Sequence, residues 1–201
     1  MALYDLADPA VPLPPQLVVD SSLLLALRPG DDNPHALAAQ RFIRRLRQQI
    51  AAYQMVAWLL MPVLQECYHV ILANSLRRTL RPGSGQAWAA MDPVARPPNW
   101  LVMYKRQPEL LRVGFPELAE FGRILATIPL TPVQPEDLAT SAGGEPLEER
   151  LHYFITAYYL LPQDALILAE AERLGVLAVA TLDQDWRRAT AFDVYTCLNE
   201  T

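Results

Sequence analysis

Short apolar runs alternate along this chain with longer segments in which apolar residues recur every three or four positions. The short runs have the length and composition of buried strands. They lie at residues 16–20, 55–60, 176–181 and 192–197, with a weaker candidate at 129–135. Runs that are apolar throughout, rather than alternating, predict a sheet covered on both faces.

The intervening segments have the periodicity of amphipathic helices. They lie at residues 33–53, 62–78, 108–128, 145–160 and 162–174. Pro62 and Pro162 suit the first turn of a helix, and Gly175 suits the left-handed residue that follows one. Alternating strands and helices predict an α/β fold, a three-layer α/β/α sandwich with a short, mainly parallel central sheet.

The length of 201 residues suits one domain with its own core. Residues 1–15 are rich in proline and predict an extended N-terminal arm, and residues 16–201 are expected to form a single domain. Within it, we expect a long helical and irregular insertion at about 79–135, where "RPGSGQ" and "ARPPNW" interrupt the pattern. A connection this long inside a compact domain is often functional.

Charge is unevenly distributed along the chain. The net charge is −5, yet residues 41–112 hold eleven Arg or Lys and three Asp or Glu, so this segment is +8 and the remainder is −13. A basic segment in an acidic chain is a candidate surface for a phosphate backbone, although a solvated helix face produces the same pattern. The candidate RNA-binding residues in this region are Arg77, Arg78, Arg81 and Arg106.

Several features bear on the cellular location. The two cysteines, Cys67 and Cys197, form neither a metal-binding pair nor a disulfide framework, which favours a reducing compartment. The N-terminal residues lack the basic and apolar regions of a signal peptide. The longest apolar run, residues 55–64, contains Pro62 and is too short to cross a bilayer. We therefore expect a cytoplasmic protein without a membrane partner.

Four carboxylates fall at points that the predicted fold brings together. Asp20 and Asp183 follow two of the apolar strands directly, in "LVVD" and "VATLD". The carboxyl ends of parallel strands share one edge of the sheet, where open α/β folds bind ligands. Glu66 lies early in one predicted helix and Asp164 in the first turn of another. Right-handed connections place both helix starts near the same edge.

A cluster of four carboxylates calls for a cation, because the like charges otherwise repel one another. Oxygen ligands favour Mg²⁺ or Mn²⁺, and such ions activate water and stabilise displacement at a phosphodiester. The hydroxyls of Ser21, Ser22 and Thr181 lie beside the aspartates and suit the orientation of metal ligands. Taken singly, Asp164 also suits a helix N-terminus and Asp183 a turn, so the signal is the order of all four acids.

The order of these motifs resembles that of the PIN domain family. "LVVDSSLLL" supplies a strand that ends in Asp followed by Ser, and "PVLQECYHVIL" supplies a helical Glu. "PQDALILAEAERLGVLAVATLDQDW" is similar to the late helix of the family, its next strand and the Thr and Asp residues that follow. The C-terminal block, roughly residues 162–196, is the most specific part of the resemblance.

The resemblance implies a PIN-like sandwich, a Mg²⁺ or Mn²⁺ site and endonuclease activity on single-stranded RNA. The catalytic and metal-binding residues would be Asp20, Glu66, Asp164 and Asp183, with secondary roles for Ser22, Thr181 and Asp185. Many small bacterial members resemble VapC-type toxins, which an antitoxin protein neutralises and which are often homodimers. The chain is longer than a minimal toxin, and the extra length falls mostly in residues 79–135.

Other functions remain open from the sequence. A PIN-like domain can act as a non-catalytic binding module, and a metal nuclease can act on another nucleic acid. Glu66 with His69, and Glu149 with His152, have the Glu-x-x-His spacing of a di-iron four-helix bundle. That fold also needs a Glu on each of two further helices, and the predicted helix at 34–50 carries no acid. Glycine motifs for dinucleotides or for a P-loop are absent from the sequence.

Overall fold

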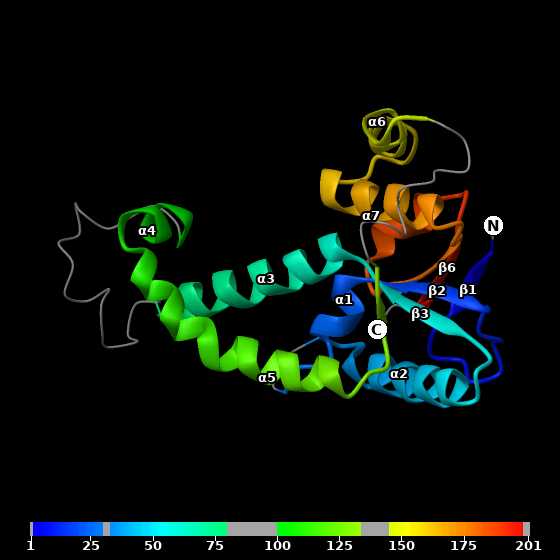
Figure 1. Cartoon of the computed structure of the whole chain (residues 1–201), viewed down its shortest axis with the longest axis horizontal. Helices are drawn as coiled ribbons and strands as arrows, with labels where there is room; N and C mark the ends of the chain where they lie inside the picture. The colour runs from blue at the N-terminus through cyan, green and yellow to red at the C-terminus, as the bar shows by residue number, and fades with distance from the viewer. Residues whose placement is uncertain (1, 30–32, 80–99, 134–144, 199–201) are drawn as a thin grey trace. The chain divides into compact units, whose positions relative to one another are not determined.

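The computed structural model describes residues 2–29, 33–79, 100–133 and 145–198 (Figure 1). They contain one six-stranded, wholly parallel sheet with the strand order β1-β6-β5-β2-β3-β4. The strands are β1 (Leu3–Asp5), β2 (Gln16–Val19), β3 (Val56–Leu59), β4 (Thr131–Pro132), β5 (Ala178–Ala180) and β6 (Asp193–Thr196). The predicted α/β class and the short parallel sheet are confirmed.

Helices occupy the segments between the strands. They are α1 (Ser21–Leu25), α2 (Ala36–Ala51), α3 (Met61–Thr79), α4 (Trp100–Arg106), α5 (Phe115–Ala126), α6 (Leu147–Tyr158) and α7 (Pro162–Arg173), with the 3-10 helices η1 (Pro108–Gly114) and η3 (Gln184–Arg188). Gly175 follows α7 with φ of 71°, as predicted for a residue that ends a helix in the left-handed region. Within the described ranges, every helix is too short or too polar to cross a membrane.

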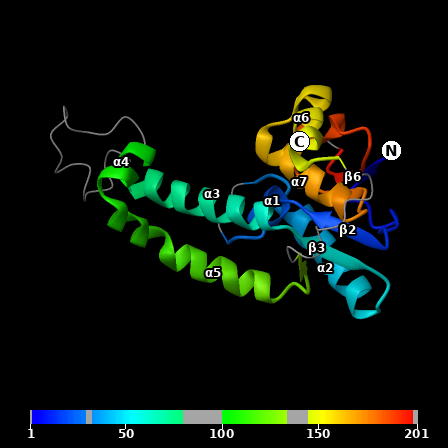
Figure 2. The same ribbon diagram turned by 45° about the horizontal axis from the view of Figure 1, so that its top comes forward.

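The sheet has helices on both of its faces. In both views, α6 and α7 lie over one face, whereas α1 and α2 lie over the other (Figures 1 and 2). The β2 residues Leu17, Val18 and Val19 are completely buried, which explains why this run is apolar without alternation. These layers confirm the predicted α/β/α sandwich, and a continuous parallel sheet excludes the four-helix bundle that a di-iron site of that type needs.

The N-terminal segment contributes a strand to the sheet. β1 pairs in parallel with β6, so that Tyr4 lies opposite Tyr195. The two rings stack with their centroids 4.6 Å apart, and the backbone N–H of Leu6 donates to the carbonyl of Thr196 at 2.8 Å. The first residues of the predicted proline-rich arm are therefore extended, and they form one edge of the sheet.

The chain divides into two compact units. The first comprises Met1–Gln65 and Leu125–Thr201 and contains the sheet, and the second comprises Glu66–Ile124. In the second unit, the hydroxyl of Ser75 donates to Glu117 at 2.9 Å, which links α3 to α5. β4 belongs to the sheet, although its residues fall inside the range 79–135 that the sequence assigns to an insertion.

Candidate active site

The two central strands of the sheet, β5 and β2, flank the point where the strand order reverses. From β2 the chain continues to β3 on one side, and from β5 it continues to β6 on the other side. The register pairs Val18 with Val179 and Val19 with Ala180. The backbone N–H of Asp20 donates to the carbonyl of Ala180 at 2.9 Å, which extends this pairing by one step. Ligands of open α/β sheets bind at such a switch point, beyond the carboxyl ends of the strands.

Asp20 is a buried carboxylate at this switch point. Its side chain is only 2 % exposed. Three donors converge on Oδ2, namely the Ser22 hydroxyl at 2.6 Å, the Thr181 hydroxyl at 2.8 Å and the Ser22 backbone N–H at 3.2 Å. Oδ1 is approached by the Ser21 hydroxyl at the longer distance of 3.4 Å. One carboxylate oxygen is thus held tightly by the protein, and the other is held more loosely.

Burial dominates the electrostatics of Asp20. Loss of solvent raises the pKa of this carboxyl above its usual value, and the hydrogen bonds from Ser22 and Thr181 offset part of that rise. The charged form therefore carries a net desolvation cost in the protein alone. A cation next to the carboxylate would lower this cost, because an opposite charge at short range favours the ionised form.

Two hydroxyls connect the ends of β2 and β5 to each other. The hydroxyls of Ser22 and Thr181 lie 3.1 Å apart. The Ser22 hydroxyl also accepts from the backbone N–H of Leu182 at 2.9 Å, and the Thr181 hydroxyl accepts from that of Asp183 at 3.0 Å. The network joins the backbone after β5 to Ser22 and Thr181, and the same two hydroxyls orient the Asp20 carboxylate before any ligand binds.

Asp183 and Asp185 have different environments. Asp183 is the N-cap of η3, and its Oδ1 accepts from the backbone N–H of Asp185 at 2.9 Å. The Asp185 carboxylate instead forms an exposed ion pair with Arg188 at 2.9 Å. Trp186 is completely buried and anchors η3 in the core. The Asp183 backbone N–H is therefore the one tied to the Thr181 hydroxyl, and the predicted role of the Asp183 carboxylate as a metal ligand stays a prediction.

Asp164 and Glu66 both lie near the start of a helix. Asp164 is in the first turn of α7 and is 9 % exposed. Within the first unit, the Gln163 side-chain N–H donates to the carbonyl of Pro62 at 2.8 Å, which ties the start of α7 to the start of α3. Glu66 lies in the second turn of α3 and is half-buried, and it is the first residue of the second unit.

The donor set suits a hard divalent cation. All the predicted ligands are carboxylate oxygens, and Asp20 presents its less engaged Oδ1 at a buried position. Within the described residues, however, no three His, Cys, Asp or Glu side chains are grouped closely enough to hold a metal ion. Joint action of Asp20, Glu66, Asp164 and Asp183 at one ion therefore stays a prediction.

The candidate RNA-binding arginines differ in their contacts. Arg78 forms an ion pair with Glu117, so part of its charge is used within the second unit. Arg77 is exposed and donates to the Asn74 side chain at 3.2 Å, and Arg106 is exposed at the end of α4. Arg81 lies outside the described residues. Arg77 and Arg106 are therefore the exposed, described candidates besides Arg78, which pairs with Glu117.

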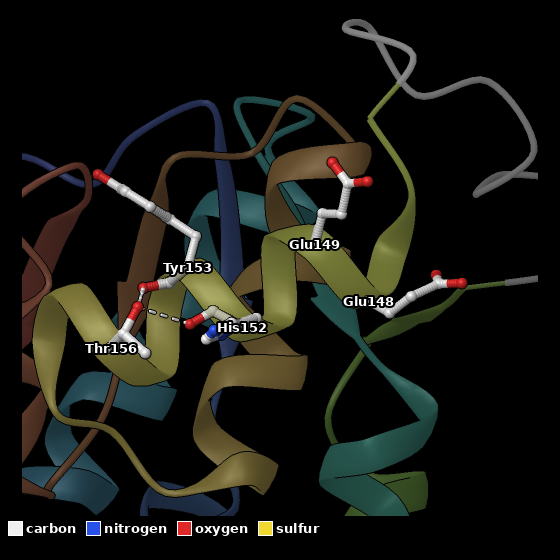
Figure 3. Close-up of a pocket in the computed structure, with 5 residues that line it drawn as sticks. All are labelled: Glu148, Glu149, His152, Tyr153 and Thr156. Atoms are coloured by element: carbon white, nitrogen blue, oxygen red, sulfur yellow. Dashed lines mark hydrogen bonds between the residues drawn. The ribbon is translucent and has the colours of Figure 1, made fainter.

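A hollow lies on the surface of α6, and none of the four predicted acids lines it. Its lining residues come from one helix and are Glu148, Glu149, His152, Tyr153 and Thr156 (Figure 3). The Thr156 hydroxyl is turned back to its own helix, donating to the carbonyl of His152 at 2.9 Å. Glu149 and His152 thus lie on an outer helix of a sandwich, and not in the core of a bundle.

Sequence reasoning missed part of the local structure. Asp20 is the N-cap of the short helix α1, which begins at Ser21 directly after β2. The Asp-Ser-Ser triplet is the available signal, because Asp and Ser are preferred at helix N-termini. The Gln163 side-chain bond to Pro62 had no sequence signal, because it joins segments that are distant in the chain.

The comparisons with known proteins identify no relative of this chain. No protein-family model matches the chain, and no curated protein or solved structure matches it either.

Proposed function

We propose that this protein is a divalent-metal-dependent endoribonuclease that hydrolyses phosphodiester bonds of single-stranded RNA. The observation that carries the proposal is Asp20, a buried carboxylate at the switch point of a parallel sheet, oriented by two hydroxyls. The sequence resemblance to PIN domains supports the choice of reaction. Asp20, Glu66, Asp164 and Asp183 are the proposed catalytic and metal-binding residues.

Each residue has a distinct task in this proposal. Bound Mg²⁺ or Mn²⁺ would supply the positive charge that acidifies a water and neutralises the phosphate in the transition state. Asp20 would present Oδ1 to the ion, while Ser22 and Thr181 hold Oδ2 and so fix the carboxylate plane. Asp164, Asp183 and Glu66 would complete the oxygen ligands. Asp185 would support the turn that positions Asp183.

The proposed substrate follows from the charge distribution. A segment of net charge +8 at residues 41–112 suits attraction of a polyanion, even though the whole chain is acidic. Arg77 and Arg106 are its exposed, described candidates.

We further propose a cytoplasmic protein that acts as the toxin of a toxin–antitoxin pair, as a homodimer that an antitoxin protein neutralises. Expression of the wild type alone would then arrest growth, whereas Asp20→Asn would not.

A cleavage assay tests the proposal. Purified protein is incubated with end-labelled, unstructured RNA of mixed sequence in Mn²⁺, in EDTA and in EDTA followed by excess Mn²⁺. We expect cleavage only with free Mn²⁺, and a loss of about 100-fold or more in rate for Asp20→Asn. The control is Glu148→Gln, which removes an exposed acid on α6 and should cleave at the wild-type rate. Equal cleavage in EDTA and by Asp20→Asn would overturn the metal mechanism.

A non-catalytic binding module is the second candidate. The favouring observation is that the Ser22 and Thr181 hydroxyls already satisfy Asp20 Oδ2, as a purely structural carboxylate also requires. Binding of RNA by the wild type without cleavage across varied sequences, in both Mg²⁺ and Mn²⁺, would favour this candidate over the nuclease.

A further inference from the structure

Tyr159 has an unusual backbone conformation for a tyrosine. It is the C-cap of α6, with φ of 54° and ψ of 41°, in the left-handed region. Bulky residues rarely adopt this region, because Cβ then crowds the following carbonyl oxygen. The equivalent role after α7 is filled by Gly175, with φ of 71°. A glycine would thus serve the turn at Tyr159 better than a tyrosine does.

The Tyr159 side chain does not contribute to the core. The residue is 77 % exposed, and its neighbour Leu161 is 68 % exposed, whereas Leu160 between them is 4 % exposed. Leu160 therefore anchors the segment, and the two flanking side chains face solvent. Met61, at the start of α3, is another large apolar residue that is 55 % exposed. We call Met61, Tyr159 and Leu161 the apolar rim.

The apolar rim lies at the same edge of the sheet as the proposed active site. Met61 follows the carboxyl end of β3, the strand next to β2. Leu161 is the N-cap of α7 and precedes Asp164 by three positions. The side-chain bond from Gln163 to the Pro62 carbonyl, 2.8 Å long, fixes the two rim segments against each other within the first unit.

We propose that Tyr159 is a substrate-positioning residue that stacks on an unpaired nucleobase of the RNA, with Met61 and Leu161 as the apolar floor beside it. This inference rests on the proposed function. Single-stranded RNA exposes flat base faces that a duplex hides, and aromatic side chains bind such faces with little regard to sequence. The rim carries no charge, so it complements a base while the acidic site complements a metal-bound phosphate.

The chain provides a matched control. Tyr53 is also a tyrosine with positive φ, at 56°, and it is 98 % exposed. It lies between α2 and β3, before the amino end of β3, and so at the opposite edge of the sheet. Loss of this ring removes the same chemical group from another exposed left-handed position, at a place where no RNA contact is proposed.

The test measures kcat/KM for cleavage of a 12-nucleotide single-stranded RNA in Mn²⁺. Tyr159→Ala should lower kcat/KM by about 10-fold or more, because stacking contributes that much per base. Tyr159→Phe should restore most of the loss, and Tyr53→Ala should match the wild type. Replacement of the bases by abasic riboses should lower kcat/KM for the wild type and have a smaller effect on Tyr159→Ala.

Stability measurements separate substrate positioning by Tyr159 from a purely structural role of this residue. Tyr159→Gly should shift the urea midpoint of unfolding upward, since it relieves the left-handed strain, and yet it should lose activity as Tyr159→Ala does. A variant that loses activity only in proportion to lost stability would overturn the inference. Wild-type kcat/KM in Tyr159→Ala would also overturn the inference, whether or not the variant changes from dimer to monomer. The proposed nuclease activity would stand in that case. If the wild type cleaves no RNA at all, the proposed function fails and the inference fails with it.

Discussion

The Thr181 hydroxyl donates a 2.8 Å hydrogen bond to Oδ2 of Asp20, across 161 positions of sequence. The two residues meet because β2 and β5 are parallel neighbours whose register pairs Val19 with Ala180, the residues immediately before them. This bond joins the two strands at the switch point of the sheet. It makes the orientation of a buried carboxylate a direct consequence of the sheet register.

Replacement of Thr181 by Val should destabilise the protein. Valine keeps the shape of threonine and removes the hydroxyl that donates to Asp20 and accepts from the Asp183 N–H. We expect a loss of about 1–3 kcal/mol in the free energy of unfolding, the typical cost of leaving buried polar groups unsatisfied. Urea unfolding in EDTA measures it. Thr181→Ser, which keeps the hydroxyl, should lose less, and equal losses for Val and Ser would contradict the role given to the hydroxyl.

Asp20→Asn should change stability and activity in opposite directions. Burial raises the pKa of Asp20, so the charged carboxylate costs free energy in the metal-free protein, and a neutral amide removes that cost. We expect the variant to be more stable than the wild type in EDTA, while RNA cleavage in Mn²⁺ is lost. A variant that is less stable than the wild type in EDTA would show that the carboxylate serves the fold.

Glu170 gives a prediction about pH. Burial raises the pKa of this carboxyl, although Arg173 opposes the shift. The folded protein therefore binds the proton more tightly than the unfolded chain does. The stabilising contribution is present below the ordinary pKa of Glu, and it is lost as the pH rises through the raised pKa of the folded protein. The stability of Glu170→Gln relative to the wild type should thus increase from pH 4 to pH 7 in urea unfolding, and a constant difference would refute the shift.

Tyr53→Gly should stabilise the protein. Tyr53 has φ of 56° after α2, a conformation that glycine adopts without strain, and its ring is exposed. Relief of left-handed strain should add about 1 kcal/mol to the free energy of unfolding. Tyr53→Ala keeps a Cβ and should add less. Thermal unfolding of the three proteins compares them, and a destabilised Tyr53→Gly would mean that the exposed ring makes contacts that stabilise the fold.

The sequence predicted the central strands because their burial leaves a direct trace. Leu17, Val18 and Val19 are completely buried, and only apolar residues are tolerated there. β1 was not predicted as a strand, because Leu3–Asp5 is three residues long and depends on pairing with β6 at the other end of the chain. Local pattern carries no information about a partner that distant.

The candidate site was predictable to a similar degree. A carboxylate after each of two buried parallel strands implies a shared edge, and the register then places Asp20 beside Thr181. The difference between Asp183 and Asp185 depends on which side chain caps η3 and which pairs with Arg188, and two aspartates two residues apart give no such signal. Tyr159 was missed because positive φ at a tyrosine is a property of the folded chain.

Direct measurement of Mn²⁺ binding tests the central claim, that Asp20 is the buried anchor of a divalent-metal site. Electron paramagnetic resonance follows the signal of free Mn²⁺ as metal-free protein is titrated. We expect that the wild type and Glu148→Gln both remove Mn²⁺ from solution, and that Asp20→Asn does so at least about 10-fold more weakly. Equal Mn²⁺ binding by the wild type and Asp20→Asn, or no binding by the wild type, would contradict it.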